Sequence, residues 1–228
     1  MSSYSRLLLL IAGLGARPLT AQTPPCPEPD STAPWVRVGR AWSDETHAHW
    51  SDDSLRRVLL AMRDRDQAAR ADFGARVTDS SYLRQLMATD SVIGSQMGEI
   101  LDRFGLPSRA VVGPEGVSAA MLIVQHNWPL QERVLALATA ARAGSVSPEA
   151  LAMLEDRVRV HQGKAQRFGT QFNAGPDGLF RLALTDDLDG LAARRAAAGL
   201  PPLPLYVCYL EQAGMRVDRR SIPATALR

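Results

Sequence analysis

The chain has 228 residues, of which 46% are hydrophobic, and it carries 26 basic against 24 acidic side chains. This length fits one ordinary domain with additional segments, and this hydrophobic content excludes a wholly disordered chain. Nearly all the basic residues are arginines interspersed with acids, as in RDRDQAAR at residues 63–70, so the sequence offers no basic stripe for a nucleic acid.

Residues 1–21 have the pattern of a signal peptide. Arg6 precedes a short apolar run at residues 7–14, and cleavage is expected after Ala21. The run is shorter than the roughly 20 residues that span a bilayer. We therefore expect an exported protein, periplasmic or secreted, that has no membrane span once the signal is removed. Loss of Arg6 and Arg17 would leave basic and acidic residues equal in number.

Residues 22–50 are expected to be a proline-rich linker followed by an irregular segment. His47 and His49 would share one face of a strand, but no third ligand stands at a suitable spacing, so no metal site is predicted. Cys26 lies in the linker and Cys208 on a predicted helix. An oxidising compartment would allow them to pair, but nothing in the sequence brings them together, so paired and free states both remain open.

Residues 51–213 are expected to form a single, mainly α-helical domain, with a loose polar tail at 214–228. Apolar periodicity, caps and breakers predict the helices. They are expected at residues 51–75, 81–104, 117–126, 129–143, 147–162 and 187–198, and from about 204 onward. Gly105 and the Gly113–Pro114 pair are expected to interrupt the chain between helices. The segment that starts near Val117 is apolar nearly all round, which predicts a central helix.

One acid falls on the apolar face of the first helix. Asp66 therefore needs a hydrogen-bond donor, and a nearby arginine is the natural candidate. Farther along, residues 165–172 and 179–184 flank a glycine-rich turn and predict a small β-hairpin.

Several segments of the chain, in this order, resemble a bacterial family known as domain of unknown function 6624. They are RDRDQAAR, FGLP, AAMLIVQHNWPLQ, LEDRVRVHQGKAQRFGTQF and DLDGLAARRAAAGLPPLPLY, and the resemblance covers roughly residues 55–209. Where the family usually continues Gln-His with a small residue and an aspartate, this chain has Asn127 and Trp128. The resemblance implies the same boundaries and the same polar residues, but no activity.

The first candidate site is Gln125–His126, at the end of the apolar segment. His126 is either a general base or ligand contact, or a structural residue that secures a broken helix end, where Asn127 caps the next helix. The second candidate is Asp156–Arg157. Arg157 is either a clamp for an anion or a structural partner of Asp66 or Asp187.

The third candidate site is formed by Gln166, Thr170 and Gln171 in the first strand of the predicted hairpin. On a strand, Gln166 and Thr170 share one face with two phenylalanines, and Gln171 points the other way. Such a set either lines a sugar or peptide pocket or satisfies the hairpin itself. Asp186, Asp187 and Asp189 are expected to cap the helix that follows them.

Two functions are compatible with these observations, and neither requires a cofactor. The first is an exported, non-catalytic helical domain that binds a small polar ligand or an envelope protein. In this function the candidate residues gather at one concave spot; they are Gln125, His126, Arg157, Gln166, Thr170 and Gln171. The alternative is a hydrolase-like enzyme in which His126 is the general base and Asp156 orients it.

Overall fold

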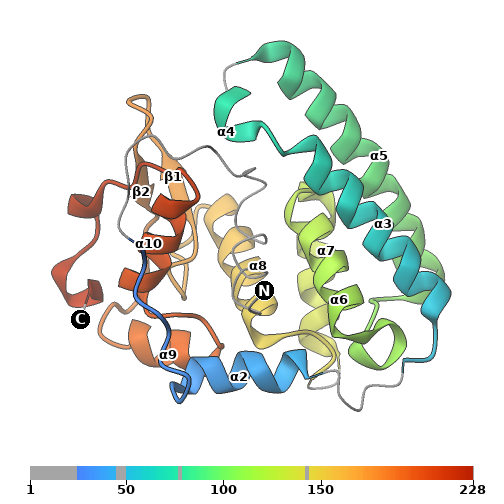
Figure 1. Ribbon diagram of the computed structural model, residues 1–228, viewed down its shortest axis with the longest axis horizontal. Coiled ribbons are helices and arrows are strands. Elements are labelled where there is room, and N and C mark those ends of the chain that lie inside the picture. Colours follow the sequence, from blue (N-terminus) through green and yellow to red (C-terminus); the bar gives the residue numbers. More distant parts are fainter. Residues whose placement is uncertain (1–24, 45–49, 77–78, 142–143, 228) are drawn as a thin grey trace. The chain divides into compact units, whose positions relative to one another are not determined.

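The computed structural model describes residues 25–44, 50–76, 79–141 and 144–227 (Figure 1). These residues are mainly helical with one two-stranded antiparallel sheet, which confirms the predicted fold class. Contacts divide the described chain into two compact units. The middle unit has the described residues between 41 and 151, and the terminal unit has residues 25–40 and 152–227. The prediction of one domain over residues 51–213 did not include this division.

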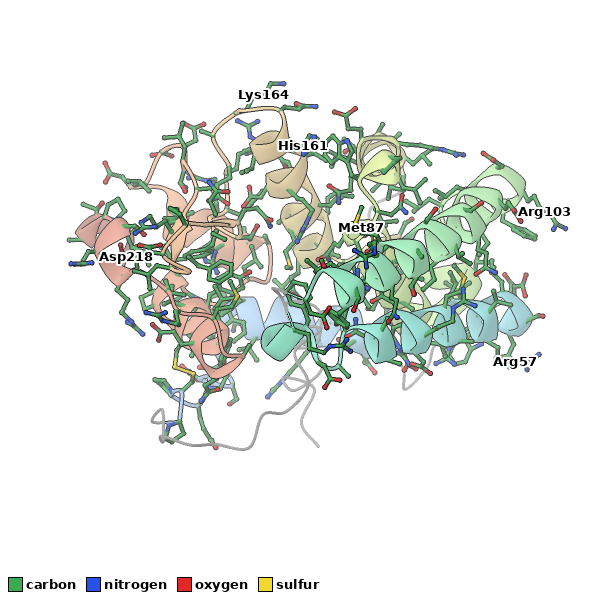
Figure 2. All side chains as sticks on the ribbon, turned by 90° about the horizontal axis from the view of Figure 1, so that it is seen from above. Arg57, Met87, Arg103, His161, Lys164 and Asp218 are labelled. Atoms are coloured by element: carbon green, nitrogen blue, oxygen red, sulfur yellow. A yellow bond between two sulfur atoms is a disulfide. The ribbon has the colours of Figure 1, made fainter. Side chains whose placement is uncertain are left out.

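The middle unit is built from packed helices. They are α3 (Asp53–Ala69), α4 (Phe73–Arg76), α5 (Ser80–Phe104), α6 (Arg109–Gln125) and α7 (Trp128–Ala140). Figure 1 shows α3 lying alongside α5 and α6, and both pairs are in contact. Arg57 near the start of α3 and Arg103 near the end of α5 lie at the same end of this pair in Figure 2, so the two helices are antiparallel.

Helix α6 is the centre of the middle unit, as its apolar sequence predicted. Every residue from Ala119 to Gln125 is buried. The helix begins at Arg109, earlier than expected. It kinks at Gly113, which has a φ of 71° and precedes Pro114. A side chain at Gly113 would stand 2.9 Å from the Trp50 ring, so the kink requires glycine both for its conformation and for space.

The first predicted helix, residues 51–75, is shorter in the structure. It ends at Ala69, and the short helix α4 follows a turn. The Tyr82 hydroxyl donates to the Ala69 carbonyl at 2.8 Å, which satisfies an acceptor that the helix end leaves free. The next residue, Arg70, is the C-cap of α3, and its side chain donates to Asp66 and Asp90.

The terminal unit combines helices with the hairpin. It contains most of α2 (Pro34–Ser43) and α8 (Pro148–His161), the strands β1 (Phe172–Ala174) and β2 (Phe180–Leu182), α9 (Leu191–Ala197), α10 (Leu203–Gln212) and the 3₁₀ helices η1 (Arg219–Ser221) and η2 (Ala224–Leu227). Its core consists of buried residues from α9, α10 and the segment after α10, namely Leu191, Leu203, Tyr206, Val207, Leu210, Ile222 and Ala226. A disulfide joins Cys26 to Cys208 on α10.

Two predictions about the segments on either side of the predicted helical domain are wrong. Residues 35–50 were expected to be irregular, but α2 occupies much of this segment and buries Trp35, Val36 and Trp42. The tail after Gly214 was expected to be loose, but Phe180 donates its N–H to the Arg216 carbonyl at 2.8 Å. Ile222 and Ala226 then join the core, because these apolar side chains bury area that a solvated tail would leave in water.

The hairpin is present, but its first strand starts later than predicted. Phe172 pairs with Leu182 and Ala174 with Phe180. Residues 165–171 do not continue strand β1 apart from a bridge between Gln166 and Thr185, and Gly169 has a φ of 64°. The alternating face predicted for Gln166 and Thr170 is therefore wrong. No helix among the described residues is long and apolar enough to cross a membrane.

Candidate functional site

His126 lies at the C-terminal end of α6, where the chain turns into α7. Its Nδ1 is 3.0 Å from Oδ1 and 3.1 Å from Oδ2 of Asp66, a residue on α3 that is 1% exposed. The structure therefore gives His126 a carboxylate partner, but the partner is Asp66. Asp156, which the sequence suggested for this role, belongs to the terminal unit and its carboxylate makes other contacts.

Asp66 is held by a buried network. Arg70, one turn later on α3, donates from Nη1 to Asp66 at 2.7 Å and from Nη2 to Asp90 of α5 at 2.7 Å. Gln67 donates to the second oxygen of Asp66 at 2.8 Å. Burial alone would raise the pKa of Asp66, but the hydrogen bond and charge of His126 and the charge of Arg70 lower it below its ordinary value. Asp66 is thus an ionised acceptor.

The orientation of the imidazole follows from this contact. An ionised carboxylate only accepts hydrogen bonds, so Nδ1 of His126 is the donor in the pair. The opposite nitrogen, Nε2, has no hydrogen-bond partner among the described residues and is open to solvent, and the side chain is 20% exposed. His126 therefore presents one free ring nitrogen whose direction is set by a buried acid.

Asn127, the next residue, contacts α5 at this same turn between α6 and α7, which we call the His126 corner. It occupies the N-cap position of α7, as predicted, but its side chain does not cap that helix. Its Nδ2 donates instead to the Asp90 carbonyl at 3.2 Å. The amide lies directly over Gly94 of α5, where a Cβ atom would stand 1.7 Å from Nδ2. The absence of a side chain at Gly94 thus allows α5 to approach the start of α7.

Three glutamines around this corner have polar atoms with unused hydrogen-bonding capacity. Among the described residues, Oε1 of Gln67, Nε2 of Gln125 and Oε1 of Gln131 are enclosed without a partner. Gln131 donates its Nε2 to the Gln125 carbonyl at 2.9 Å, and Gln125 adjoins His126. Buried polar atoms are normally paired, and an unpaired one indicates enclosed water or a ligand group. Two acceptors and one donor thus remain unpaired inside the middle unit beside His126.

Apart from this corner, the middle unit has a groove of about 350 Å³ between α3 and α5. The side chains that line it include Val58, Met62, Arg65, Ile100 and Phe104. None of the residues singled out from the sequence lines the groove.

Asp156, in the terminal unit, makes hydrogen bonds with a loop and not with His126. Its side chain, on α8, is fully buried and accepts the N–H groups of Arg167 at 2.7 Å, Phe168 at 3.0 Å and Thr170 at 3.0 Å, as well as the Thr170 hydroxyl at 2.9 Å. Burial raises the pKa of Asp156, in opposition to these four donors, which lower it. The carboxylate holds the loop of residues 166–171 through these bonds. Figure 2 labels His161 and Lys164, which precede this loop in the chain.

Gln166 closes the same loop. Its Oε1 accepts the Gln171 N–H at 2.8 Å, and its Nε2 donates to the Gln171 and Ala183 carbonyls and to Thr185 Oγ1. These bonds, together with those of Thr170 to Asp156, use the groups that the sequence suggested for a ligand. Of the three hairpin candidates, Gln171 alone is partly exposed, and its Nε2 donates to Thr170 Oγ1 at 3.0 Å.

Arg195 holds the loop of residues 166–171 by donating hydrogen bonds to carbonyl groups of the loop, a role that the sequence did not suggest. This α9 residue is 1% exposed and donates to the carbonyls of Phe168, Gly169 and Pro201. Its guanidinium lies 5.0 Å from the centre of the Tyr206 ring. The acids at 186–189 were expected to cap the next helix, but the N-cap of α9 is Gly190 and no side chain caps it. The alternative that pairs Arg157 with Asp187 is also wrong, because Asp187 accepts from Gly190 N–H and Arg194.

The structure assigns the predicted residues to two units. Gln125 and His126 belong to the middle unit, and the other candidates belong to the terminal unit. Within the terminal unit, Asp156, Gln166, Thr170 and Gln171 come together around one loop. His47 and His49 lie outside the described residues. Among the residues that are described, no three His, Cys, Asp or Glu side chains form a group that would hold a metal ion.

A family model described as "Family of unknown function (DUF6624)" matches residues 53–218. The chain therefore belongs to this family. No curated protein and no solved structure matches it. The match includes the whole His126 corner and the loop around Asp156.

Proposed function

We propose that the chain is an exported binding protein whose middle unit recognises a small neutral polar ligand at His126. One observation carries this proposal: Nε2 of His126 is open, while Nδ1 is fixed by the buried Asp66. A nitrogen held in this way is ready to accept a hydrogen bond without first losing side-chain freedom, which lowers the cost of binding.

The surrounding glutamines support a neutral ligand that carries hydroxyl or amide N–H groups. Gln67 and Gln131 each keep an unfilled oxygen acceptor, and Gln125 keeps an unfilled donor. Asp66 and Asp90 are already matched by Arg70. The charges near His126 are therefore paired with one another, while neutral hydrogen-bonding groups are unpaired, which favours an uncharged polar ligand.

The test is an NMR titration with glucose as a hydroxyl probe and N-acetylglycinamide as an amide probe. We expect saturable shifts in the backbone amides of residues 125–127 with at least one probe. His126→Gln should weaken that binding by about tenfold or more, the value of one lost hydrogen bond to a buried site. His161→Gln, which changes an exposed histidine on α8, is the matched control and should leave binding unchanged. Equal binding by the His126→Gln variant would contradict the proposal.

The same geometry favours catalysis as a second candidate. Nε2 of His126 would act as a general base toward water or a substrate hydroxyl, and Asp66 would take the orienting role assigned to Asp156 from the sequence. Hydrolysis of p-nitrophenyl acetate separates the two functions. A catalytic His126 predicts a loss of about 100-fold or more in His126→Gln, with His161→Gln unchanged. Equal rates in wild type and His126→Gln would leave binding as the only role.

Export forms part of the proposal. The disulfide between Cys26 and Cys208 supports it, because structural disulfides form and persist in oxidising compartments. The basic Arg6 and the apolar run at residues 7–14 also support it. The mass of the protein recovered from the periplasm or the medium of an expressing bacterium is the test. We expect the mature chain to begin at Gln22, whereas a full-length chain confined to the cytoplasm would contradict export.

A further inference from the structure

Arg157 differs from the other buried cations of the terminal unit. It lies on α8, next to Asp156, and its Nε is enclosed with no hydrogen-bond partner among the described residues. Its two Nη atoms also have no hydrogen-bond partner there, and they are not fully enclosed. The acids suggested for it from the sequence are matched elsewhere, Asp66 by Arg70 and Asp187 by Arg194.

The surrounding charges do not compensate Arg157. The carboxylate of Asp156 is directed to the N–H groups of the loop, and Glu155 pairs with Arg167 at 3.0 Å. Arg195, by contrast, donates from Nε and Nη1 to three carbonyl groups, and its guanidinium lies over the Tyr206 ring. Arg157 is therefore a partly buried cation with no hydrogen-bond acceptor among the described residues of the terminal unit.

An arginine in this position cannot relieve its burial by losing a proton. Burial lowers the pKa of Arg157, but a guanidinium stays charged under ordinary conditions. A partly buried cation without a counter-charge costs free energy, and an anion that docks against it recovers that cost. The open Nη atoms present parallel N–H donors, the arrangement that carboxylate and phosphate oxygens accept.

We propose that Arg157 is the cationic end of a second binding site, which takes the oxyanion of a small carboxylate or phosphate. This proposal rests on Arg157 of the terminal unit and does not depend on the function proposed for His126.

The test is thermal unfolding of the oxidised mature protein with inorganic phosphate or acetate, against sodium chloride at matched ionic strength. We expect a saturable rise in Tm with one of the two anions and none with chloride, because only a ligand that binds the folded state shifts the transition. A rise with phosphate alone identifies a phosphate site, and a rise with acetate alone identifies a carboxylate site.

Two variants make the test specific. Arg157→Met should abolish the anion-dependent rise and should raise the Tm measured without anion, because it removes an uncompensated charge. Arg216→Gln, which removes an exposed arginine of the same unit, should behave like wild type. An equal rise in Arg157→Met and wild type, or no rise up to about 50 mM, where a millimolar site is filled, would overturn the proposal.

The Nε–H resonance of Arg157 provides a measurement that does not depend on a variant that folds. In protein labelled with ¹⁵N-arginine, we expect this resonance to shift on addition of the stabilising anion. A resonance that stays fixed while other arginines shift would also overturn the assignment.

Discussion

Nδ1 of His126 lies 3.0 Å from a carboxylate oxygen of Asp66, a residue sixty positions earlier in the chain and 1% exposed. This contact joins the end of α6 to α3, and Arg70 extends it to Asp90 on α5. The histidine that the sequence singled out is therefore part of a network that also holds three helices of the middle unit together.

Asp66→Asn should destabilise the protein strongly. The change removes the negative charge that Arg70 and His126 both contact, and breaking a buried ion pair costs about 3–5 kcal/mol. Asp102→Asn breaks the exposed pair with Arg133 and should cost less than about 1 kcal/mol. Urea unfolding of both variants measures the difference. Similar small losses would show that the network adds little to stability.

The contribution of Asp66 should depend on pH in a defined direction. Its pKa is lowered in the folded state, whereas in the unfolded chain it takes the ordinary value of about 3.9. The stabilisation is therefore complete above about pH 4 and is lost as the pH falls through the folded-state pKa. The difference in unfolding free energy between wild type and Asp66→Asn should shrink as the pH falls below about 4. A difference that grows on acidification would contradict this sign.

Two glycines of α5 should respond oppositely to alanine. At Gly94 a Cβ would overlap the Asn127 amide, so Gly94→Ala should cost about 1–3 kcal/mol through overpacking and should displace Asn127 beside His126. At Gly98 the nearest atom, of Leu130, is 4.0 Å away, so Gly98→Ala should stabilise the helix by about 0.5–1 kcal/mol. Thermal unfolding of the pair tests this, and a stabilised Gly94→Ala would show that the two helices do not approach this closely.

Asp156→Asn should loosen the loop of residues 166–171. An amide has only one oxygen to offer to three N–H groups and a hydroxyl, and its own NH₂ would face donors. Hydrogen exchange at Arg167, Phe168 and Thr170 should accelerate, with a loss of stability of about 3 kcal/mol. Glu211→Gln, which alters a carboxylate on α10 that pairs with Arg219 and not with the loop, is the control. Unchanged exchange in Asp156→Asn would mean that other contacts hold the loop.

The disulfide should contribute substantially to the stability of the oxidised protein. Cys26 and Cys208 are 182 residues apart, and closing a loop of this length restricts the unfolded chain by about 5 kcal/mol on the entropic estimate. Cys26→Ser, Cys208→Ser and reduced wild type should therefore lose similar stability, and reduction should not affect either variant further. Unfolding with and without reductant measures this, and a reductant effect in either variant would point to a different cause.

Local signals in the sequence predicted much of the fold. Ser147 caps α8 by accepting the Ala150 N–H at 3.0 Å, and Gly105 ends α5 with a φ of 71°. The need of Asp66 for an arginine was also clear, because Arg70 follows it by one helical turn. These features depend on residues three to five positions apart, and the helical spacing determines which of them come into contact.

Contacts between segments that are far apart in the sequence could not be predicted from these local patterns. The alternation in residues 165–171 resembles a strand, but Asp156 on α8 takes the N–H groups that a strand would pair with a neighbour. Likewise, the partner of His126 was assigned to the wrong aspartate, since nothing local distinguishes Asp66 from Asp156. The identities of the polar candidates could be read from the sequence, but their partners are set by tertiary packing.

The tautomer of His126 tests the central claim most directly, because both binding and catalysis at this corner require a free Nε2. A long-range ¹H–¹⁵N NMR spectrum of the neutral imidazole reports which ring nitrogen carries the proton. The contact with Asp66 predicts a protonated Nδ1 and a bare Nε2. A spectrum with the proton on Nε2 would contradict the account and leave His126 without a free acceptor.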